Sequence, residues 1–483
     1  MPASYAVRFV RWSGKVYKLS TGPTSAMMHA HVRHDTGRLT MSMPTTLRVR
    51  TRATKLAVLL STALASSGVT PAPSMSAGSG LRVTSCADDG SPGTLRSVML
   101  SAPPGSVIDL TQLTCSKITL DQGAIDLIDA GVFSATVMGP GADRLTIDGN
   151  YIDTVFRASE IEIDGLTLTH GRAHGSGGCV VGYLSVVLRS SRVIECAAYG
   201  DNGAAGGGIA SNYVISLYST IVADNMAIAA SGRAYGGGAA SFYNLVKVVD
   251  STISGNTAIG DPARGGGLYA LGRTSITGST LDNNVADVGG GSYCRRSFFD
   301  YADCEVIDST ISGNIAHDSG GGLVVAAYEG AFVTIDNSTI AYNTAQAGHV
   351  GGVLLTHTPQ PTITLQSSIF ANNSAGVTDL APDLDTDSAT FAAVTGGNDL
   401  LMTVGRIQPF PAIIGDPLLA PLADNGGPTR THALLPGSPA IDAGNNVANL
   451  ATDQRGRARV SGAAADIGAY EVQTDAIFAN GFD

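Results

Sequence analysis

Residues 309–322 read STISGNIAHDSGGG, and residues 338–352 repeat the same plan as STIAYNTAQAGHVGG. Each unit opens with Ser-Thr or Ser-Ser, continues through an apolar residue to an asparagine, and ends in a glycine cluster. The apolar position recurs every 28 to 32 residues, at Val193, Ile221, Ile253, Leu281, Ile311, Ile340 and Ile369. A period of this length is typical of a solenoid in which each unit forms one turn.

Within each unit, apolar and polar residues alternate over short stretches such as 333–335, Val-Thr-Ile. Alternation with a period of two is typical of strands that bury one face. Stacked turns bring equivalent strands to about 4.8 Å from one another, so that each unit covers the apolar face of the next. The sequence therefore predicts an all-β fold, a single-stranded right-handed parallel β-helix.

One asparagine of each unit is expected to stack on the next inside this helix. The expected members of this ladder are Asn256, Asn284, Asn314, Asn343 and Asn372. Stacked amides can hydrogen-bond to one another along the axis and satisfy the backbone of the turns.

The first 65 residues have the composition of a targeting segment. Basic residues from Arg48 onward precede an apolar run that begins at Leu56 and ends at Ala65 in a small-x-small cleavage site. This order is typical of a secretory signal, and the run is too short for a permanent membrane span. We expect residues 1–65 to be an upstream extension plus a signal peptide, with no transmembrane helix left after its removal.

Composition divides the remaining chain into five parts. We expect a flexible linker at 66–80, an N-terminal cap with the first strands at 81–130, β-helix repeats at 131–395, a C-terminal module at 396–472 and a tail at 473–483. Residues 94–100 are expected to form a short amphipathic helix that covers the open end of the core, as repeat arrays require.

The expected mature chain is strongly acidic. Residues 1–65 hold ten of the 29 Lys and Arg residues but one of the 40 Asp and Glu residues, which leaves 19 basic and 39 acidic residues and a formal charge of −20. A nucleic-acid-binding protein needs a basic surface, so this function is excluded. Binding to a bare anionic lipid or polyuronate is also disfavoured unless a divalent cation bridges the charges.

Six cysteines, an even number, follow the signal. They are Cys86, Cys115, Cys179, Cys196, Cys294 and Cys304. Export favours disulfides, and the absence of a CxxC pair argues against a zinc site. We favour the local pairings 86–115, 179–196 and 294–304, while the sequence alone leaves other pairings open.

Three groups of motifs carry a resemblance to known proteins. The GGG-(Ile/Leu) and Ile-x-x-Asn repeats resemble those of polymorphic outer-membrane-protein-like and pectate-lyase-like β-helix proteins. VTSCADDG (83–90) with PGTLR (92–96) resembles the N-terminal cap of such bacterial proteins. DPLL (416–419), DNGGP (424–428), LLPGSPAIDAG (434–444), DQRG (453–456) and DIGAYE (466–471) are similar to a choice-of-anchor Q module. The resemblance implies a secreted or surface protein, usually one without an assigned activity.

The stretch EIEID, residues 160–164, is the first candidate for chemistry. Alternation turns both isoleucines inward and Glu160, Glu162 and Asp164 outward on one strand. These carboxylates could hold Ca²⁺ or act as an acid/base pair, with Arg189 on the following turn as a basic partner. The nearby residues His170, Arg172 and Arg192 are further candidates. A solvated outer face of an acidic protein is the alternative that we favour.

A second candidate is a Ca²⁺ site at Asp383, Asp385 and Asp387. The D-x-D-x-D spacing is that of a calcium loop, but Ser388 and Val394 stand where an EF-hand needs glycine and glutamate. An EF-hand is therefore excluded, and a looser Ca²⁺ site competes with an acidic loop that leaves the last repeat.

A third cluster of charge lies in the C-terminal module. Arg455, Arg457 and Arg459 are close in sequence to Asp442, Asp453, Asp466 and Glu471. We expect a structural ion-pair network rather than a binding site.

The sequence favours an exported, non-enzymatic protein that acts as an adhesin-like or interaction scaffold and is monomeric. Variable turns such as 226–235 and 257–264 would contact a surface glycan or a protein of a host or neighbouring cell. The location would be outside a bacterial cell, secreted or on the surface or outer membrane. The alternative is a polysaccharide lyase or hydrolase with its site on the outer face around residues 144–172, since a fold alone does not carry a function.

Overall fold

A computed structural model describes residues 80–295, 303–326, 332–356, 362–377, 382–386, 394–403, 405–407 and 411–473, together with strands β1 (Val7–Trp12) and β2 (Lys15–Ser20). The chain divides into two compact units, Met1–Pro73 and Ser74–Asp483. In the first unit, β1 and β2 pair antiparallel. The expected signal segment and the tail from residue 474 onward lie outside the described residues.

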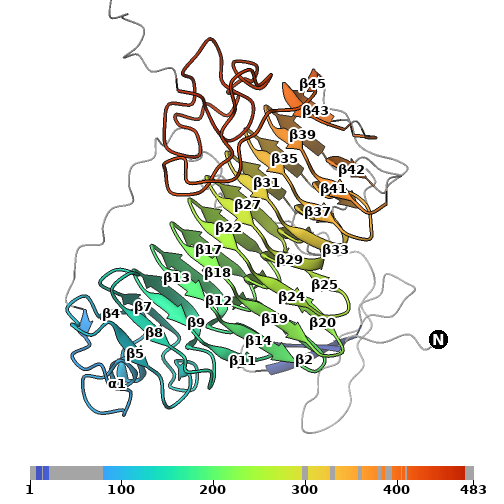
Figure 1. Ribbon diagram of the computed structural model, residues 1–483. Coiled ribbons are helices and arrows are strands. Elements are labelled where there is room, and N and C mark those ends of the chain that lie inside the picture. The colour runs from blue at the N-terminus through green and yellow to red at the C-terminus, as the bar shows by residue number, and fades with distance from the viewer. Residues whose placement is uncertain are drawn as a thin grey trace, which may run out of the picture. The chain divides into compact units, whose positions relative to one another are not determined.

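The second unit is a β-solenoid of about 10 turns whose stacked strands pair in parallel, so the expected parallel β-helix is confirmed (Figure 1). Three sheets run along its axis, and each turn contributes strands to them in order. Because equivalent positions of successive turns are in register, each side chain stacks on its counterpart one turn away.

Sheet 1 has twelve strands, which carry the Ser-Thr-Ile part of each repeat. They are β5 (Lys117–Thr119), β8 (Thr146–Asp148), β10 (Thr167–Thr169), β13 (Arg192–Ile194), β18 (Ile221–Ala223), β23 (Thr252–Ser254), β28 (Thr280–Asp282), β32 (Thr310–Ser312), β36 (Thr339–Ala341), β40 (Ile369–Ala371), β44 (Asp399–Leu401) and β45 (Ala412–Ile414).

Sheet 2 follows the asparagine of each repeat. Its strands are β11 (Arg172–His174), β14 (Ala197–Gly200), β15 (Gly203–Ala205), β19 (Met226–Ala229), β20 (Arg233–Tyr235), β24 (Thr257–Ile259), β25 (Ala263–Arg264), β29 (Val285–Val288), β33 (Ile315–Ser319), β37 (Thr344–Ala345) and β41 (Ser374–Ala375).

Sheet 3 follows the glycine clusters and closes the turn. Its strands are β3 (Leu81–Arg82), β4 (Ser106–Asp109), β6 (Ile125–Asp126), β7 (Ser134–Met138), β9 (Phe156–Asp164), β12 (Val180–Arg189), β16 (Ile209–Ser211), β17 (Val214–Tyr218), β21 (Ala239–Ser241), β22 (Leu245–Val249), β26 (Leu268–Leu271), β27 (Arg273–Thr277), β30 (Ser292–Arg295), β31 (Asp303–Ile307), β34 (Leu323–Ala326), β35 (Phe332–Asp336), β38 (Val353–Thr356), β39 (Thr362–Gln366), β42 (Leu384–Thr386) and β43 (Val394–Gly397).

The inward column of sheet 1 differs by one residue from the expected column at two turns. Strand pairing places Val222 in the core beside Ile253, whereas the expected Ile221 is 36% exposed. In the same way, Phe370 lies in the core and Ile369 packs against the C-terminal module. A shift of one residue moves a strand residue to the opposite face, and the register of the stack selects which face is buried.

The asparagine ladder is present, with one member displaced from its expected position. Its buried members are Asn225, Asn256, Asn284, Asn314, Asn343 and Asn373. Each Nδ2 donates to Oδ1 of the next asparagine at 2.9 to 3.0 Å, and each backbone N–H donates to the same oxygen at 2.9 to 3.1 Å. The expected Asn372 is instead a turn residue with φ of 57°.

A second ladder of hydroxyl groups runs through the sheet 3 to sheet 1 turns. The backbone N–H groups of Ser251, Ser279, Ser309 and Ser338 each donate to Oγ of the serine one turn on, at 3.1 to 3.2 Å. Both ladders end on a carboxylate. Asn373 donates to Asp383, and Ser368 donates to Asp399, each at 2.9 Å.

The N-terminal end of the core is covered by helix α1 (Leu95–Ser101), which confirms the expected helical cap. Thr94 caps the helix by accepting a hydrogen bond from the Ser97 backbone N–H. Leu95 and Met99 are fully buried, while Arg96 pairs with a buried aspartate, Asp88, at 2.8 Å.

The C-terminal module is irregular and packs along the outer side of sheet 1. Stacking continues past residue 395 through β44 and β45, and the chain then folds back onto earlier turns (Figure 1). Thr280 Oγ1 donates to the Arg430 carbonyl at 2.6 Å, and Thr310 Oγ1 donates to Gln454 at 2.7 Å. Within the described residues, no helix has the length and apolar character needed to cross a membrane.

Candidate functional site

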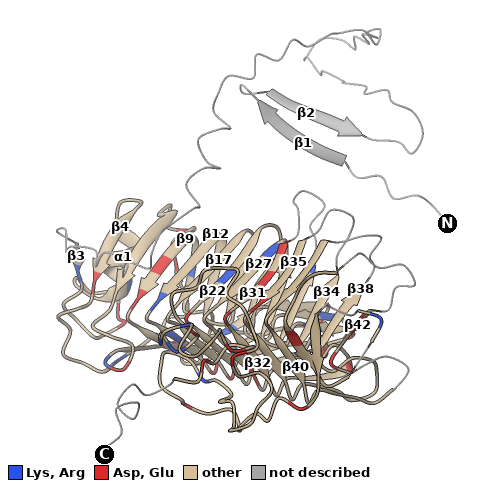
Figure 2. Cartoon of the chain, turned by 90° about the horizontal axis from the view of Figure 1, so that it is seen from above, with Lys and Arg blue, Asp and Glu red and all other residues tan. Residues whose placement is uncertain are grey.

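Strand β9 presents the expected alternation of acids and isoleucines. Ile161 and Ile163 are buried in the core, whereas Glu160, Glu162 and Asp164 face outward. Figure 2 shows how sparsely charge is distributed over the strands, so that the acidic part of β9 stands out from its neighbours.

Arg189 comes to this acidic patch from the next turn, as expected. It pairs in register with Asp164, and its Nε donates to Glu162 Oε1 at 2.7 Å. Its guanidinium also lies 4.4 Å from the centroid of the Tyr218 ring. Burial raises the pKa of Asp164, an effect that Arg189 opposes and Glu162 reinforces. The acids and the arginine therefore form an ion-paired patch on the outer face of sheet 3.

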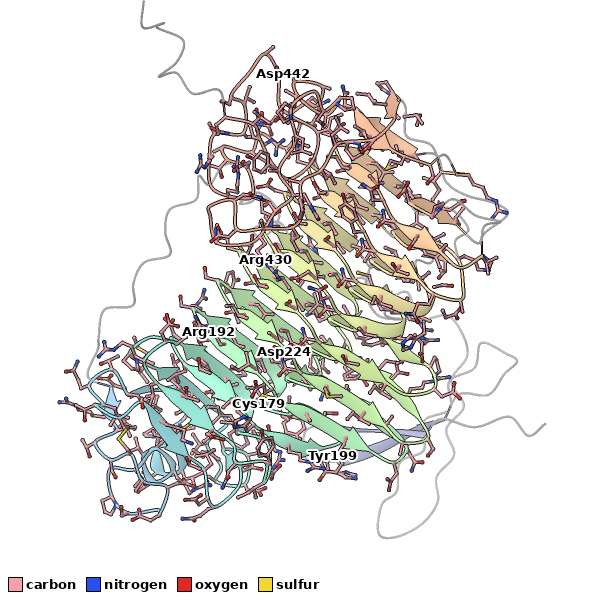
Figure 3. The ribbon with its side chains drawn as sticks, in the orientation of Figure 1. Cys179, Arg192, Tyr199, Asp224, Arg430 and Asp442 are labelled. Carbon is pink, nitrogen blue, oxygen red and sulfur yellow. A yellow bond between two sulfur atoms is a disulfide. The ribbon has the colours of Figure 1, made fainter. Side chains whose placement is uncertain are left out.

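The other basic candidates belong to other sheets. His170 follows β10 of sheet 1, where Nδ1 lies 3.1 Å from Asp148 and Nε2 lies 3.0 Å from Glu195. Arg192 stands on β13 of sheet 1 (Figure 3), and Arg172 stands on β11 of sheet 2. These three residues are close to the acids along the chain, but the chain changes sheet between them. The sequence shows the first relation and not the second.

Two of the three expected calcium ligands are buried. Asp383 Oδ1 accepts the backbone and side-chain N–H groups of Asn373, and its Oδ2 accepts the backbone N–H and hydroxyl of Thr403 at 3.0 and 2.7 Å. Asp385 accepts the Arg406 backbone N–H at 3.1 Å, and Asp387 lies outside the described residues. No group of three His, Cys, Asp or Glu side chains in the described part of the chain is placed to hold a metal ion. The Ca²⁺ site stays a prediction.

The expected disulfides Cys86–Cys115 and Cys179–Cys196 are formed. The third is not: Cys294 and Cys304 are buried free thiols whose sulfur atoms lie 2.7 Å apart. Strands β30 and β31, which are consecutive along the chain, bring the two side chains together as the loop length predicted. The length of a loop does not fix the oxidation state of its cysteines.

A groove opens over the turns that lead into sheet 3. Two adjoining concavities, of about 370 and 540 Å³, share Gly175, Ser176 and Phe242 in their linings. We call their joint surface the turn groove and define it by its large side chains, Arg157, His174, Tyr183, Arg233, Tyr235 and Phe242. Neither concavity includes an acid of β9.

The turn groove exists because side chains on the outer face of sheet 3 change in size from turn to turn. In register, Val181, Ala210 and Ala240 are followed by Tyr269 and Tyr293. The tyrosines fill the space above their strands and form an apolar cluster outside the main core. The small residues at the earlier turns leave that space open.

Aromatic contacts hold one wall of the turn groove in place. The Phe242 ring centroid lies 6.0 Å from that of Tyr235 and 5.9 Å from that of Tyr269. Tyr183, which also lines the groove, is 44% exposed. Aromatic rings supported in this way offer a large, rigid contact area.

The expected ion-pair network of the C-terminal module is confirmed for Arg455 and Arg459, whereas no ion pair among the described residues includes Arg457 or Asp442. Arg459 is 1% exposed and lies 3.5 Å from both Asp308 and Glu471. Arg455 binds Asp453 through Nε and Nη2 at 2.9 and 2.7 Å. Burial raises the pKa of Glu471 to about 7, although the adjacent backbone N–H groups and Arg459 lower it.

Sequence reasoning found the turns of the groove but not its residues. Arg233 and Tyr235 lie in the expected contact turn 226–235, and Asp261 lies in 257–264. Arg157 was missed, because only the register of the strands shows that the outward-facing residues stacked next to it, Val181 and Ala210, are small.

Comparisons with protein-family models, with curated proteins and with solved structures find no match to this chain. The function must therefore be argued from the residues themselves.

Proposed function

We propose that this chain is an exported, non-enzymatic β-helix protein that acts as an adhesin-like interaction scaffold on or outside a bacterial cell. It would end in a choice-of-anchor Q-type module and bind a surface glycan or a neighbouring protein through its turns. The observation that carries the proposal is the turn groove, because binding sites are concave surfaces that combine aromatic area with a few polar groups. The variable turns line it, and the carboxylate patch of β9 does not.

The enzyme alternative has one observation in its favour. Arg189 stands beside Glu162 and Asp164, and a basic group next to carboxylates is what a polysaccharide lyase or hydrolase would use. The ion pair between Glu162 and Arg189 occupies both groups, and Glu160 is exposed on the strand. This arrangement favours a solvated outer face.

The first experiment is a glycan-array binding assay on the purified chain, with and without Ca²⁺, followed by assays for new reducing ends and unsaturated products on every glycan bound. The scaffold proposal expects binding without product. Product release that is abolished by Glu162→Gln would overturn it and assign an active site to β9. Arg273→Gln, on the same face of sheet 3 at β27, is the matched control for a lost surface ion pair.

A further inference from the structure

The lining of the turn groove holds more basic than acidic side chains, in a chain that is acidic overall. Its lining includes Arg157, His174 and Arg233 but a single acid, Asp261. The net charge of the whole chain is −11. Asp126 and Asp153 pair with Arg157, which leaves Arg233 as the exposed guanidinium of the lining. Local charge, rather than net charge, decides which ligand a concave site attracts.

The basic groups differ in how they are held. Arg157 forms salt bridges with Asp126 at 2.8 Å and with Asp153 at 3.4 Å, which hold its guanidinium in place. Arg233 and His174 are exposed, and within the described residues neither has an ion pair. Arg233 therefore offers a guanidinium whose planar donors can bind a carboxylate or sulfate in bidentate fashion.

The length and walls of the groove indicate the shape of the ligand. Ser176, Ala205 and Tyr235 stack in register on three successive turns, so the groove extends over about 10 Å at about 4.8 Å per turn. The floor is made largely of glycine and alanine, and Phe242 and Tyr183 supply the rings. An apolar ring face suits the C–H face of a pyranose, and exposed backbone groups and Asn212 suit its hydroxyls.

We propose that the turn groove binds an acidic oligosaccharide two to three sugar units long. Its rings lie against Phe242 and Tyr183, and its carboxylate or sulfate group pairs with Arg233. The inference rests on the proposed scaffold function and names the ligand class of that scaffold. A mixed wall of rings and fixed polar donors favours a sugar over an extended peptide, which would need a free strand edge or apolar pockets.

The test is calorimetric titration of the full chain with three probes of equal length: an oligouronate, a sulfated oligosaccharide and a neutral oligosaccharide. We expect binding of an acidic probe and at least tenfold weaker binding of the neutral one. A preference between uronate and sulfate distinguishes the two sources of the charge. Arg233→Gln should weaken acidic binding by about tenfold or more, as expected for a lost charge-assisted hydrogen bond, and Phe242→Ala should weaken binding of every probe.

Arg273→Gln is the control, because Arg273 is a half-exposed arginine on the same solenoid that does not line the groove. It should bind like the unchanged chain. Since Arg233 is exposed, its variant should fold normally, which thermal unfolding verifies. If the acidic probe binds both the Arg233→Gln and the Phe242→Ala variant as tightly as the unchanged chain, the groove assignment is overturned but the scaffold proposal stands. Binding of a protein partner and of no oligosaccharide would have the same consequence. Failure to bind any probe overturns the groove proposal, whereas turnover of a probe overturns the scaffold proposal.

Discussion

Replacing Asn314 by alanine should open the ladder in its middle. Asn314 Oδ1 accepts the backbone N–H of Asn284 at 3.0 Å and its Nδ2 at 2.9 Å, and its own Nδ2 donates to the Leu281 carbonyl and to Asn343 Oδ1 at 2.9 Å each. All three asparagines are fully buried. Alanine would leave two N–H groups of Asn284 without an acceptor in a place that water does not reach.

The expected cost follows from those two donors. A buried N–H group that loses its partner costs about 1–3 kcal/mol, so the substitution should destabilise this part of the solenoid by about 4 kcal/mol. Because each 1.4 kcal/mol is about tenfold in an equilibrium constant, hydrogen exchange of the Asn284 amide should accelerate by about a thousandfold. Exchange followed by mass spectrometry measures this locally, which matters because long repeat arrays do not always unfold in a single step.

Asn372→Gly is the matched control. Asn372 has φ of 57° and takes no part in the ladder, and glycine already occupies the equivalent place at Gly255 and Gly313, both with positive φ. This change should leave exchange at Asn284 unaltered. Equal protection of Asn284 in the Asn314→Ala variant and the unchanged chain would refute the argument that the amide stack holds the turns together.

Three further changes test other parts of the structure. Burial raises the pKa of Asp399 to about 8 and that of Glu471 to about 7, above ordinary values of 3.8 and 4.5. Because the folded state therefore retains protons that the unfolded chain has lost, the free energy of unfolding should fall as pH rises from about 4 to 8. Thermal unfolding at pH 5 and pH 8 measures this fall, which Asp399→Asn should reduce and which greater stability at pH 8 would contradict. Arg459→Met leaves buried carboxylates without their cation and should loosen the C-terminal module by about 3–5 kcal/mol, seen as faster proteolysis there while the N-terminal turns stay resistant. Oxidised glutathione should join Cys294 and Cys304 by thiol–disulfide exchange, releasing two reduced glutathione molecules; alkylation of the unfolded, unreduced chain would then label neither, and labelling of both would show that the pair stays reduced.

The period of the repeat predicted the fold, but the period does not fix the register. In the unit that begins at Ser219, two neighbouring apolar residues, Ile221 and Val222, compete for the core. Threonine as well as serine can fill the hydroxyl position, and Thr220 does so here by its place in the stack. Only the contact between turns decides between the two alignments, and this contact is not present in any single unit.

The candidate groove was out of reach for a related reason. Its turns could be recognised as variable, and the acids of β9 could be assigned to one face, because both are properties of one segment. The groove instead depends on Val181 and Ala210 being small where Tyr269 is large, a comparison between turns almost 90 residues apart. The signal that would have revealed the groove is a change in side-chain size at equivalent positions of successive turns.

The asparagine ladder also shows how one row of the repetitive stack comes to an end. An asparagine at the last position would carry N–H groups that need a further turn to accept them. Asp383 stands at that position instead, and its Oδ1 accepts the backbone and side-chain N–H groups of Asn373 while the residue carries no side-chain amide of its own. Asp383 turns its second oxygen to Thr403 of the closing segment, so that nothing in the ladder calls for another turn. The replacement of the last asparagine by an aspartate therefore ends this ladder, and burial, which raises the pKa of the Asp383 carboxyl group, is the energetic cost of placing that group in the core.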